Sequence, residues 1–127
     1  MNPPINQFNI EPGQHPVVLI AAGIGITPIK PMASSLAKAG REYALHYAGQ
    51  SRNTMPYLNE LLSEHGNQLH LHISSEQSRL SLSNLLTQAS DQTVFYLCGP
   101  QALIAEALGI ARVKGIAADR IRFEKFV

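Results

Sequence analysis

The sequence contains little cysteine, and its charges are few and nearly balanced. A single cysteine, Cys98, among 127 residues cannot close an intramolecular disulfide or supply the roughly four thiolates of an iron–sulfur cluster. A formal net charge of +1 with 15% charged residues gives no field of one sign, which argues against nucleic-acid or anionic-membrane partners. We therefore expect a cytoplasmic protein with no iron–sulfur cluster in this chain.

Long apolar runs are also absent. The longest, from Val17 to Ile26, is far shorter than the roughly 20 residues of a membrane-spanning helix. Residues 1–13 lack a basic-then-apolar signal pattern. With 45% apolar residues, the chain can form the core of one domain but is too short for a second large one. The composition predicts one soluble domain without a membrane partner.

From Pro16 onward, apolar segments of strand length alternate with segments of helical periodicity. This alternation predicts an α/β fold, a three-layer, Rossmann-like open parallel sheet of five strands flanked by helices. The predicted strands lie at 17–22, 43–48, 69–74, 93–98 and 121–126. The predicted helices lie at 28–39, 55–65 and 101–114, with a short helix suggested by Leu80, Leu82, Leu85 and Leu86. Residues 1–14 carry three prolines and resemble a linker.

A glycine-bearing turn, residues 23–28, follows the first predicted strand. Gly23 and Gly25 allow positive φ angles and close approach of a ligand, while Thr27 and Pro28 suit the cap and first position of a helix. Free amides at such a helix start are suited to a pyrophosphate. A tight turn with a purely structural role is the alternative, and a proline replaces the usual third glycine.

A second turn, Cys98-Gly99-Pro100, follows the fourth predicted strand. Ligands of open parallel sheets collect at the carboxyl edge, where this turn would lie. A small buried hydrophobic residue at a strand end is the other reading of Cys98. The turn alone therefore does not decide between a ligand-binding and a structural role for Cys98.

The two turns and the β-α alternations between them resemble the pyridine-nucleotide domain of the ferredoxin–NADP reductase superfamily. The similarity is to reductase components of aromatic-ring dioxygenases and demethylases, such as phthalate dioxygenase reductase and vanillate demethylase reductase. It covers nearly the whole chain and assigns residues 15–127 to a pyridine-nucleotide-binding domain and 1–14 to a linker or remnant of a flavin-domain junction. Further residues that carry it are 6–8, 46–52, 57–62 and 124–126.

The resemblance implies that the domain presents the nicotinamide of NADPH or NADH to a flavin, FMN or FAD, held by a separate domain or subunit. It implies catalytic positions for Cys98 beside the nicotinamide and Phe126 near the flavin. Because the cofactors perform the redox chemistry, Cys98 is expected to orient rather than to attack. The remaining implied contacts to the pyrophosphate and nicotinamide come from Gly23, Gly25, Thr27, Pro28, Gly99 and Pro100.

The adenosine end is expected to lie near Ser51, Arg52, Ser75 and Arg79. Arginine forks suit the 2′-phosphate of NADPH, although exposed arginines are often only solvated. Glu76 instead suits the free 2′-hydroxyl of NADH. The choice between the two nucleotides stays open at this stage.

Without a flavin-binding stretch the chain is expected to be catalytically incomplete alone. It is expected to be either a fragment of a longer reductase or a small protein that uses the flavin of a partner. The expected electron acceptor after the flavin is an oxygenase component or another electron-acceptor domain. A non-catalytic nucleotide-binding or interaction module is the alternative, and a domain that has lost its ligand is a third reading, suggested by Ala22, Pro31 and Gln50. We expect no metal site, because His46, His70 and His72 have no accompanying cysteine or acidic cluster.

Overall fold

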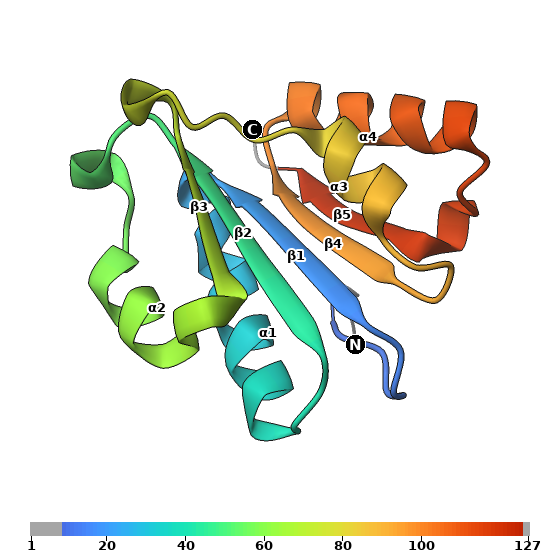
Figure 1. Cartoon of the computed structure of the whole chain (residues 1–127), viewed down its shortest axis with the longest axis horizontal. Helices are drawn as coiled ribbons and strands as arrows, with labels where there is room; N and C mark the ends of the chain where they lie inside the picture. Colours follow the sequence, from blue (N-terminus) through green and yellow to red (C-terminus); the bar gives the residue numbers. More distant parts are fainter. Residues whose placement is uncertain (1–8, 126–127) are drawn as a thin grey trace, which may run out of the picture.

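The computed structural model describes residues 9–125, which form a five-stranded parallel sheet in the order β3-β2-β1-β4-β5 (Figure 1). Every neighbouring pair of strands is parallel. The predicted α/β fold and its five strands are therefore confirmed. The strands are β1 (Val17–Ala22), β2 (Tyr43–Gly49), β3 (Leu69–Ile73), β4 (Val94–Gly99) and β5 (Ile121–Lys125).

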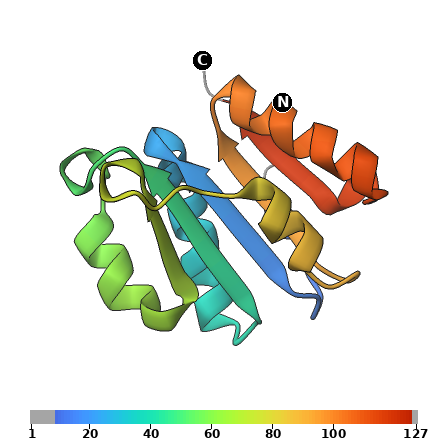
Figure 2. The ribbon, with the colours of Figure 1, turned by 45° about the horizontal axis from the view of Figure 1, so that its top comes forward.

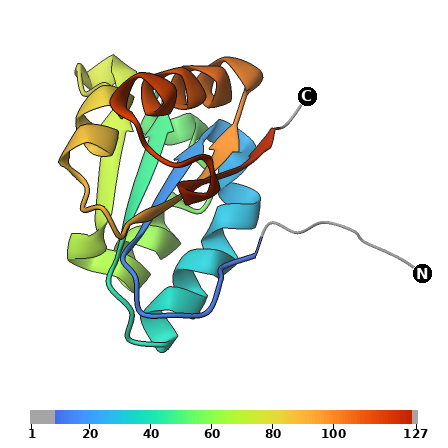
Figure 3. The same ribbon diagram turned by 90° about the vertical axis from the view of Figure 1, so that its right-hand side faces the viewer.

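Helices cover both faces of the sheet, so the domain has three layers (Figures 2 and 3). One buried cluster joins α1 (Ile26–Lys38) and α2 (Leu58–His65) to one face, and a second joins α3 (Leu82–Gln88) and α4 (Gln101–Lys114) to the other. Among residues 9–125, no helix combines the length and the apolar character that crossing a membrane requires.

The two central strands explain why the sequence shows nearly continuous apolar runs there. Every residue of β4 is buried, and β1 buries four of its six residues. Strands covered by helices on both faces have no solvent side, so apolar residues occupy both faces. The apolar run 17–22 accordingly lies in the middle of the sheet, as β1 between β2 and β4.

Two predicted helix starts are wrong by a few residues. The first helix begins at Ile26 rather than Pro28 and the second at Leu58 rather than Met55. Pro56 precedes Tyr57, whose φ of 62° is left-handed backbone, and this conformation interrupts a right-handed helix. The N-cap of α3 is Ser81, whose hydroxyl accepts a hydrogen bond from the Asn84 amide at 3.3 Å.

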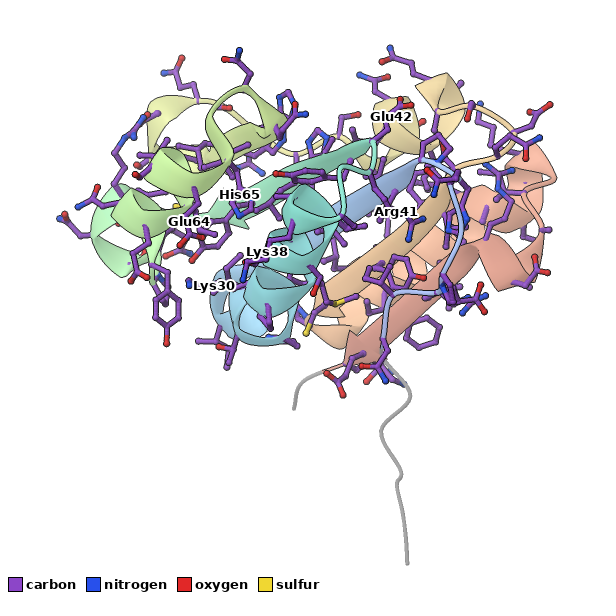
Figure 4. The ribbon with its side chains drawn as sticks, turned by 90° about the horizontal axis from the view of Figure 1, so that it is seen from below. Lys30, Lys38, Arg41, Glu42, Glu64 and His65 are labelled. Carbon is purple, nitrogen blue, oxygen red and sulfur yellow. The ribbon has the colours of Figure 1, made fainter. Side chains whose placement is uncertain are left out.

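The segment before β1 packs on the sheet through polar contacts. The Glu11 amide donates to the Tyr96 hydroxyl at 3.0 Å, and Arg122 forms an ion pair with Glu11 at 2.9 Å. Arg41, labelled in Figure 4, donates to the carbonyl oxygens of Glu11 at 2.8 Å and His15 at 3.0 Å. Ile10 and Glu11 of the expected linker therefore contact the domain, and the boundary at residue 15 stays a prediction.

Replacing Arg41 should loosen this leading segment. We expect Arg41→Ala to lower the free energy of unfolding by about 1 to 2 kcal/mol, because two charge-assisted hydrogen bonds to the backbone, one exposed and one half-buried, are lost. Urea denaturation measures the change, and limited proteolysis locates it before residue 16. The exposed Lys38 at the end of α1 supplies the control, Lys38→Ala, with an expected change below about 0.5 kcal/mol. Equal effects of the two variants would contradict the assignment.

Candidate functional site

A cavity of about 380 Å³ lies where the carboxyl ends of β1, β2 and β4 meet. The strands run toward the top of Figure 1, so their carboxyl ends share one edge. After β1 the chain crosses on the α1 face, whereas β4 is reached from the α3 face, which makes this edge the topological switch point of the sheet. The cavity is lined by Ala22, Gly23, Ala48, Gly49, Gln50, Thr54 and Pro100.

The glycine turn forms one wall of this cavity, and its two glycines have different constraints. Gly23 has a φ of 58°, and no atom lies within 4 Å of the position that a Cβ would occupy. A Cβ at Gly25 would instead overlap the carbonyl group of Cys98. Gly23 therefore leaves backbone accessible from the cavity, while Gly25 allows the two predicted turns to touch.

The start of α1 corrects one sequence-based assignment. Gly25, not Thr27, occupies the N-cap position, and no side chain caps the helix. Thr27 and Pro28 are the second and third residues of α1, with Thr27 exposed. Pro28 still costs no helical hydrogen bond, because the first turn has no intrahelical acceptors for its amides.

The Cys98 turn closes the opposite wall. The Cys98 side chain is only 3% exposed, and burial, reinforced by the nearby charge of Glu124, raises the pKa of its thiol to about 11. The thiol is therefore protonated at neutral pH, which excludes a thiolate nucleophile. Gly99 is packed against Leu103, and Pro100 lines the cavity.

The loops after β2 and β3 form the remaining side of the site. Arg52 donates to both carboxylate oxygens of Glu76, at 2.8 Å from Nε and 3.1 Å from Nη2, and this hydrogen bonding lowers the pKa of Glu76. The Ser75 amide donates to the Gln50 carbonyl at 2.9 Å, and the Ser51 hydroxyl lies 3.3 Å from the Thr54 hydroxyl. The structure thus brings Ser51, Arg52 and Ser75 together.

Two predicted site residues are not joined to this group. Arg79 is exposed and lies in the connection before α3, without an ion pair or hydrogen bond in the described part of the chain. Phe126 lies outside the described residues. Their predicted contacts to the nucleotide and to the flavin stay predictions.

Sequence reasoning missed three residues that line the cavity, Ala48, Gly49 and Thr54. The signal that could have found them is their place at or after the end of the second predicted strand. In the structure, Ala48 is the register partner of Ala22 at the end of β1. Gly49 leaves room for the Met55 side chain, which a Cβ there would overlap. Small residues at the ends of adjacent parallel strands are expected where a ligand approaches the backbone.

Three histidines cluster on the sheet face opposite α1 and α2. His46 Nδ1 lies 3.0 Å from His72 Nε2, and the His46 ring stacks on His70 and His72 with centroid distances of 4.7 and 5.2 Å. Burial, with a smaller contribution from the two neighbouring histidines, lowers the pKa of His46 to about 4. Within residues 9–125, no group of three metal-ligating side chains is arranged to hold a metal ion.

No model of a known protein family matches the chain, but individual proteins do. It is 36% identical over 124 residues to the carnitine monooxygenase reductase subunit of Escherichia coli (strain K12), which aligns 97% of this chain with 39% of that protein. It is 32% identical over 126 residues to the vanillate O-demethylase oxidoreductase of Pseudomonas sp., with 97% of this chain and 40% of that protein aligned. The chain therefore spans about two fifths of the length of these relatives.

Solved structures share the fold. Full-length CYP116B46 from Tepidiphilus thermophilus superimposes with a TM-score of 0.89 at 33% identity, over 99% of this chain and 16% of that one. Flavohemoglobin from Malassezia yamatoensis, with bound FAD and heme, gives 0.76 at 27% identity, over 90% of this chain and 32% of that one. Phthalate dioxygenase reductase gives 0.83 at 24% identity, over 95% of this chain and 38% of that one, which shows the fold alone.

The five-stranded sheet and its switch point define an α/β domain with the fold of the NAD-binding domains of ferredoxin–NADP reductase-like proteins. The chain is similar to oxygenase reductase components over about two fifths of their length, and it has the fold of ferredoxin–NADP reductase-like domains. The resemblance inferred from the two turns is thereby confirmed.

The two glycines should respond differently to alanine. Gly25→Ala is expected to lower the free energy of unfolding by about 2 to 3 kcal/mol, because the added methyl group displaces the Cys98 carbonyl. Gly23→Ala meets no atoms and should cost only the left-handed backbone conformation, about 1 to 2 kcal/mol. Urea denaturation compares them, and Gly23→Asn is the control, because asparagine tolerates this conformation. A larger loss for Gly23→Ala than for Gly25→Ala would contradict this packing.

The buried histidine should make stability depend on pH. The pKa of His46 is about 4 in the folded chain against 6.5 as the reference value, so only the unfolded chain gains a proton on this residue between these values. The contribution of His46 to the free energy of unfolding is therefore fully present above pH 6.5. It decreases as the pH falls, by about 2 kcal/mol at pH 5.

Urea denaturation at pH 7.5 and pH 5 tests this dependence on the 127-residue chain. His46→Gln should lose a large part of the decrease in stability. His70→Gln is the matched control, because His70 is exposed, and it should retain most of the decrease. An unchanged decrease in His46→Gln would show that other groups cause it.

Proposed function

We propose that this chain is the NAD(P)H-binding domain of a flavin-dependent oxidoreductase that serves as the reductase component of an oxygenase or demethylase system. The observation that carries the proposal is the cavity at the switch point of the sheet, with Gly23 leaving backbone open to it. Dinucleotides bind at this place in open α/β sheets. The names of the relatives, a carnitine monooxygenase reductase subunit and a vanillate O-demethylase oxidoreductase, support the same function.

Different residues around the cavity would contact the pyrophosphate, the nicotinamide and the adenosine of the nucleotide. Gly23 and Gly25 would let the pyrophosphate approach the start of α1, where Thr27 and Pro28 lie in the first turn. Gly99 and Pro100 would border the nicotinamide at the end of β4. The loops after β2 and β3 would hold the adenosine end through Ser51, Arg52 and Ser75.

A bound NAD(P)H would supply a hydride, and a flavin in another domain or subunit would accept it. This chain would bind and orient the nucleotide. The Cys98 thiol is protonated at neutral pH and would therefore not act as a nucleophile. Cys98 would hold the end of β4 against the start of α1, and Phe126 would approach the flavin. The FAD bound to the flavohemoglobin relative supports a flavin as the acceptor. An oxygenase component or electron-acceptor domain would then receive the electrons.

A chimera tests hydride transfer directly. The chain replaces the matching part of the vanillate O-demethylase oxidoreductase of Pseudomonas sp., and NADH- and NADPH-dependent flavin reduction is followed by stopped-flow absorbance. We expect flavin reduction, and we expect Cys98→Ser to slow it about tenfold while nucleotide affinity changes less than about twofold, because misplaced reactants lose rate rather than binding.

The controls separate the alternatives. Cys98→Ala keeps the site apolar and tests whether a buried hydroxyl, rather than altered positioning, causes the loss. Nucleotide binding without flavin reduction in an otherwise folded chimera would favour the non-catalytic binding module. The absence of any nucleotide binding up to millimolar concentration would overturn the proposed function.

A further inference from the structure

The ion pair between Arg52 and Glu76 joins the two loops at the expected adenosine end. Arg52 belongs to the turn after β2, and Glu76 belongs to the turn after β3. The guanidinium contacts both carboxylate oxygens, at 2.8 Å from Nε to Oε2 and 3.1 Å from Nη2 to Oε1. Such a two-point contact fixes the orientation of both groups.

We propose that this Arg52–Glu76 pair makes the domain select NADH over NADPH. The inference rests on the proposed nucleotide-binding function and adds the specificity of the same site. It assigns Arg52 to holding a carboxylate of this chain instead of a phosphate of the ligand. It also makes Glu76 the residue that discriminates at the 2′ position of the adenosine ribose.

The position of the pair relative to the cavity supports this role. Gln50 and Thr54, which flank Arg52 in the sequence, both line the strand-end cavity. The Ser75 amide holds the Gln50 carbonyl at 2.9 Å, so the loop that carries Glu76 is fastened to the cavity wall. Figure 1 shows the two loops beside each other at the carboxyl end of β2 and β3.

A 2′-phosphate would meet two costs at this pair. The paired face of the Arg52 guanidinium already donates to Glu76, so a phosphate that needs these donors must displace the carboxylate. The displaced carboxylate then remains within a few ångströms of a group with about two negative charges, and like charges at that distance repel. Because Arg52 is paired with Glu76, its presence does not by itself indicate a site for the 2′-phosphate.

A free 2′-hydroxyl meets neither cost. Each carboxylate oxygen has two lone pairs, so Glu76 retains acceptor capacity while it is bound to Arg52. A ribose hydroxyl can donate to this carboxylate without breaking the ion pair. Both side chains are largely accessible, with exposed fractions of 52% for Arg52 and 44% for Glu76, so salt should weaken the discrimination.

Calorimetric titration of the 127-residue chain with NADH and NADPH, at low and high salt, tests the inference. The wild-type chain should bind NADH about tenfold tighter than NADPH at low salt. Glu76→Gln keeps the size of the side chain and removes its charge, and it should raise NADPH affinity about tenfold while changing NADH affinity less than about threefold. Added salt should reduce the difference between the two nucleotides in the wild-type chain.

Two further variants make the test specific. Glu106→Gln removes the same charge from the exposed surface of α4 and should leave both affinities unchanged. Arg52→Ala should weaken NADH and NADPH binding to a similar extent, because the pair of donors that would fit a phosphate is held by Glu76. A loss of NADPH affinity much larger than the loss of NADH affinity in Arg52→Ala would overturn the inference.

The outcomes for the inference and for the proposed function are distinct. Equal affinities, or tighter binding of NADPH, in the wild-type chain would overturn the selection of NADH and leave the nucleotide-binding function standing. Binding of neither nucleotide up to millimolar concentration would overturn the proposed function and the inference with it. An equal response of Glu76→Gln and Glu106→Gln would reduce the effect to net charge and remove the assigned role of Glu76.

Discussion

The close approach of Gly25 to the Cys98 carbonyl fixes the geometry of the whole carboxyl edge. No side chain larger than hydrogen fits at Gly25 without displacing this carbonyl, and β1 and β4 remain paired up to Ala21 and Cys98. Because the backbone of Gly25 lies against the backbone of Cys98, the start of α1 packs directly against the end of β4. The cavity beside it depends on this contact, since Gly23 and Pro100 belong to the same two turns.

The sheet topology then determines what surrounds the cavity. The α1 crossover leaves β1 on one face and α4 leaves β4 on the other, so neither helix covers the gap between the two strand ends. On the β2 side the gap is bounded by loops that hold each other, through the Ser75 amide and the Arg52–Glu76 pair. The candidate site is therefore built on strand ends, and the proposed nucleotide specificity would come from the loops.

Burial keeps most of the chemistry-bearing side chains near this sheet uncharged. It raises the pKa of the Cys98 thiol to about 11 and lowers the pKa of His46 to about 4. Neither group carries a charge at neutral pH, whereas Arg52 and Glu76 carry opposite charges in the loops after β2 and β3. This distribution fits a domain that binds and orients a redox cofactor, because such a domain needs no nucleophile of its own.

Local patterns in the sequence determined the order of strands and helices along the chain, the central position of β1, the two turns and the Ser81 cap. These features depend on neighbouring residues, through hydrophobic period and turn chemistry. Tertiary structure alone decided the burial of Cys98, the left-handed Tyr57 that delays α2, and the pairing of Arg52 with Glu76, 24 residues away. These depend on which strand ends lie side by side, and the register of a parallel sheet is set by contacts between segments that are distant in the sequence.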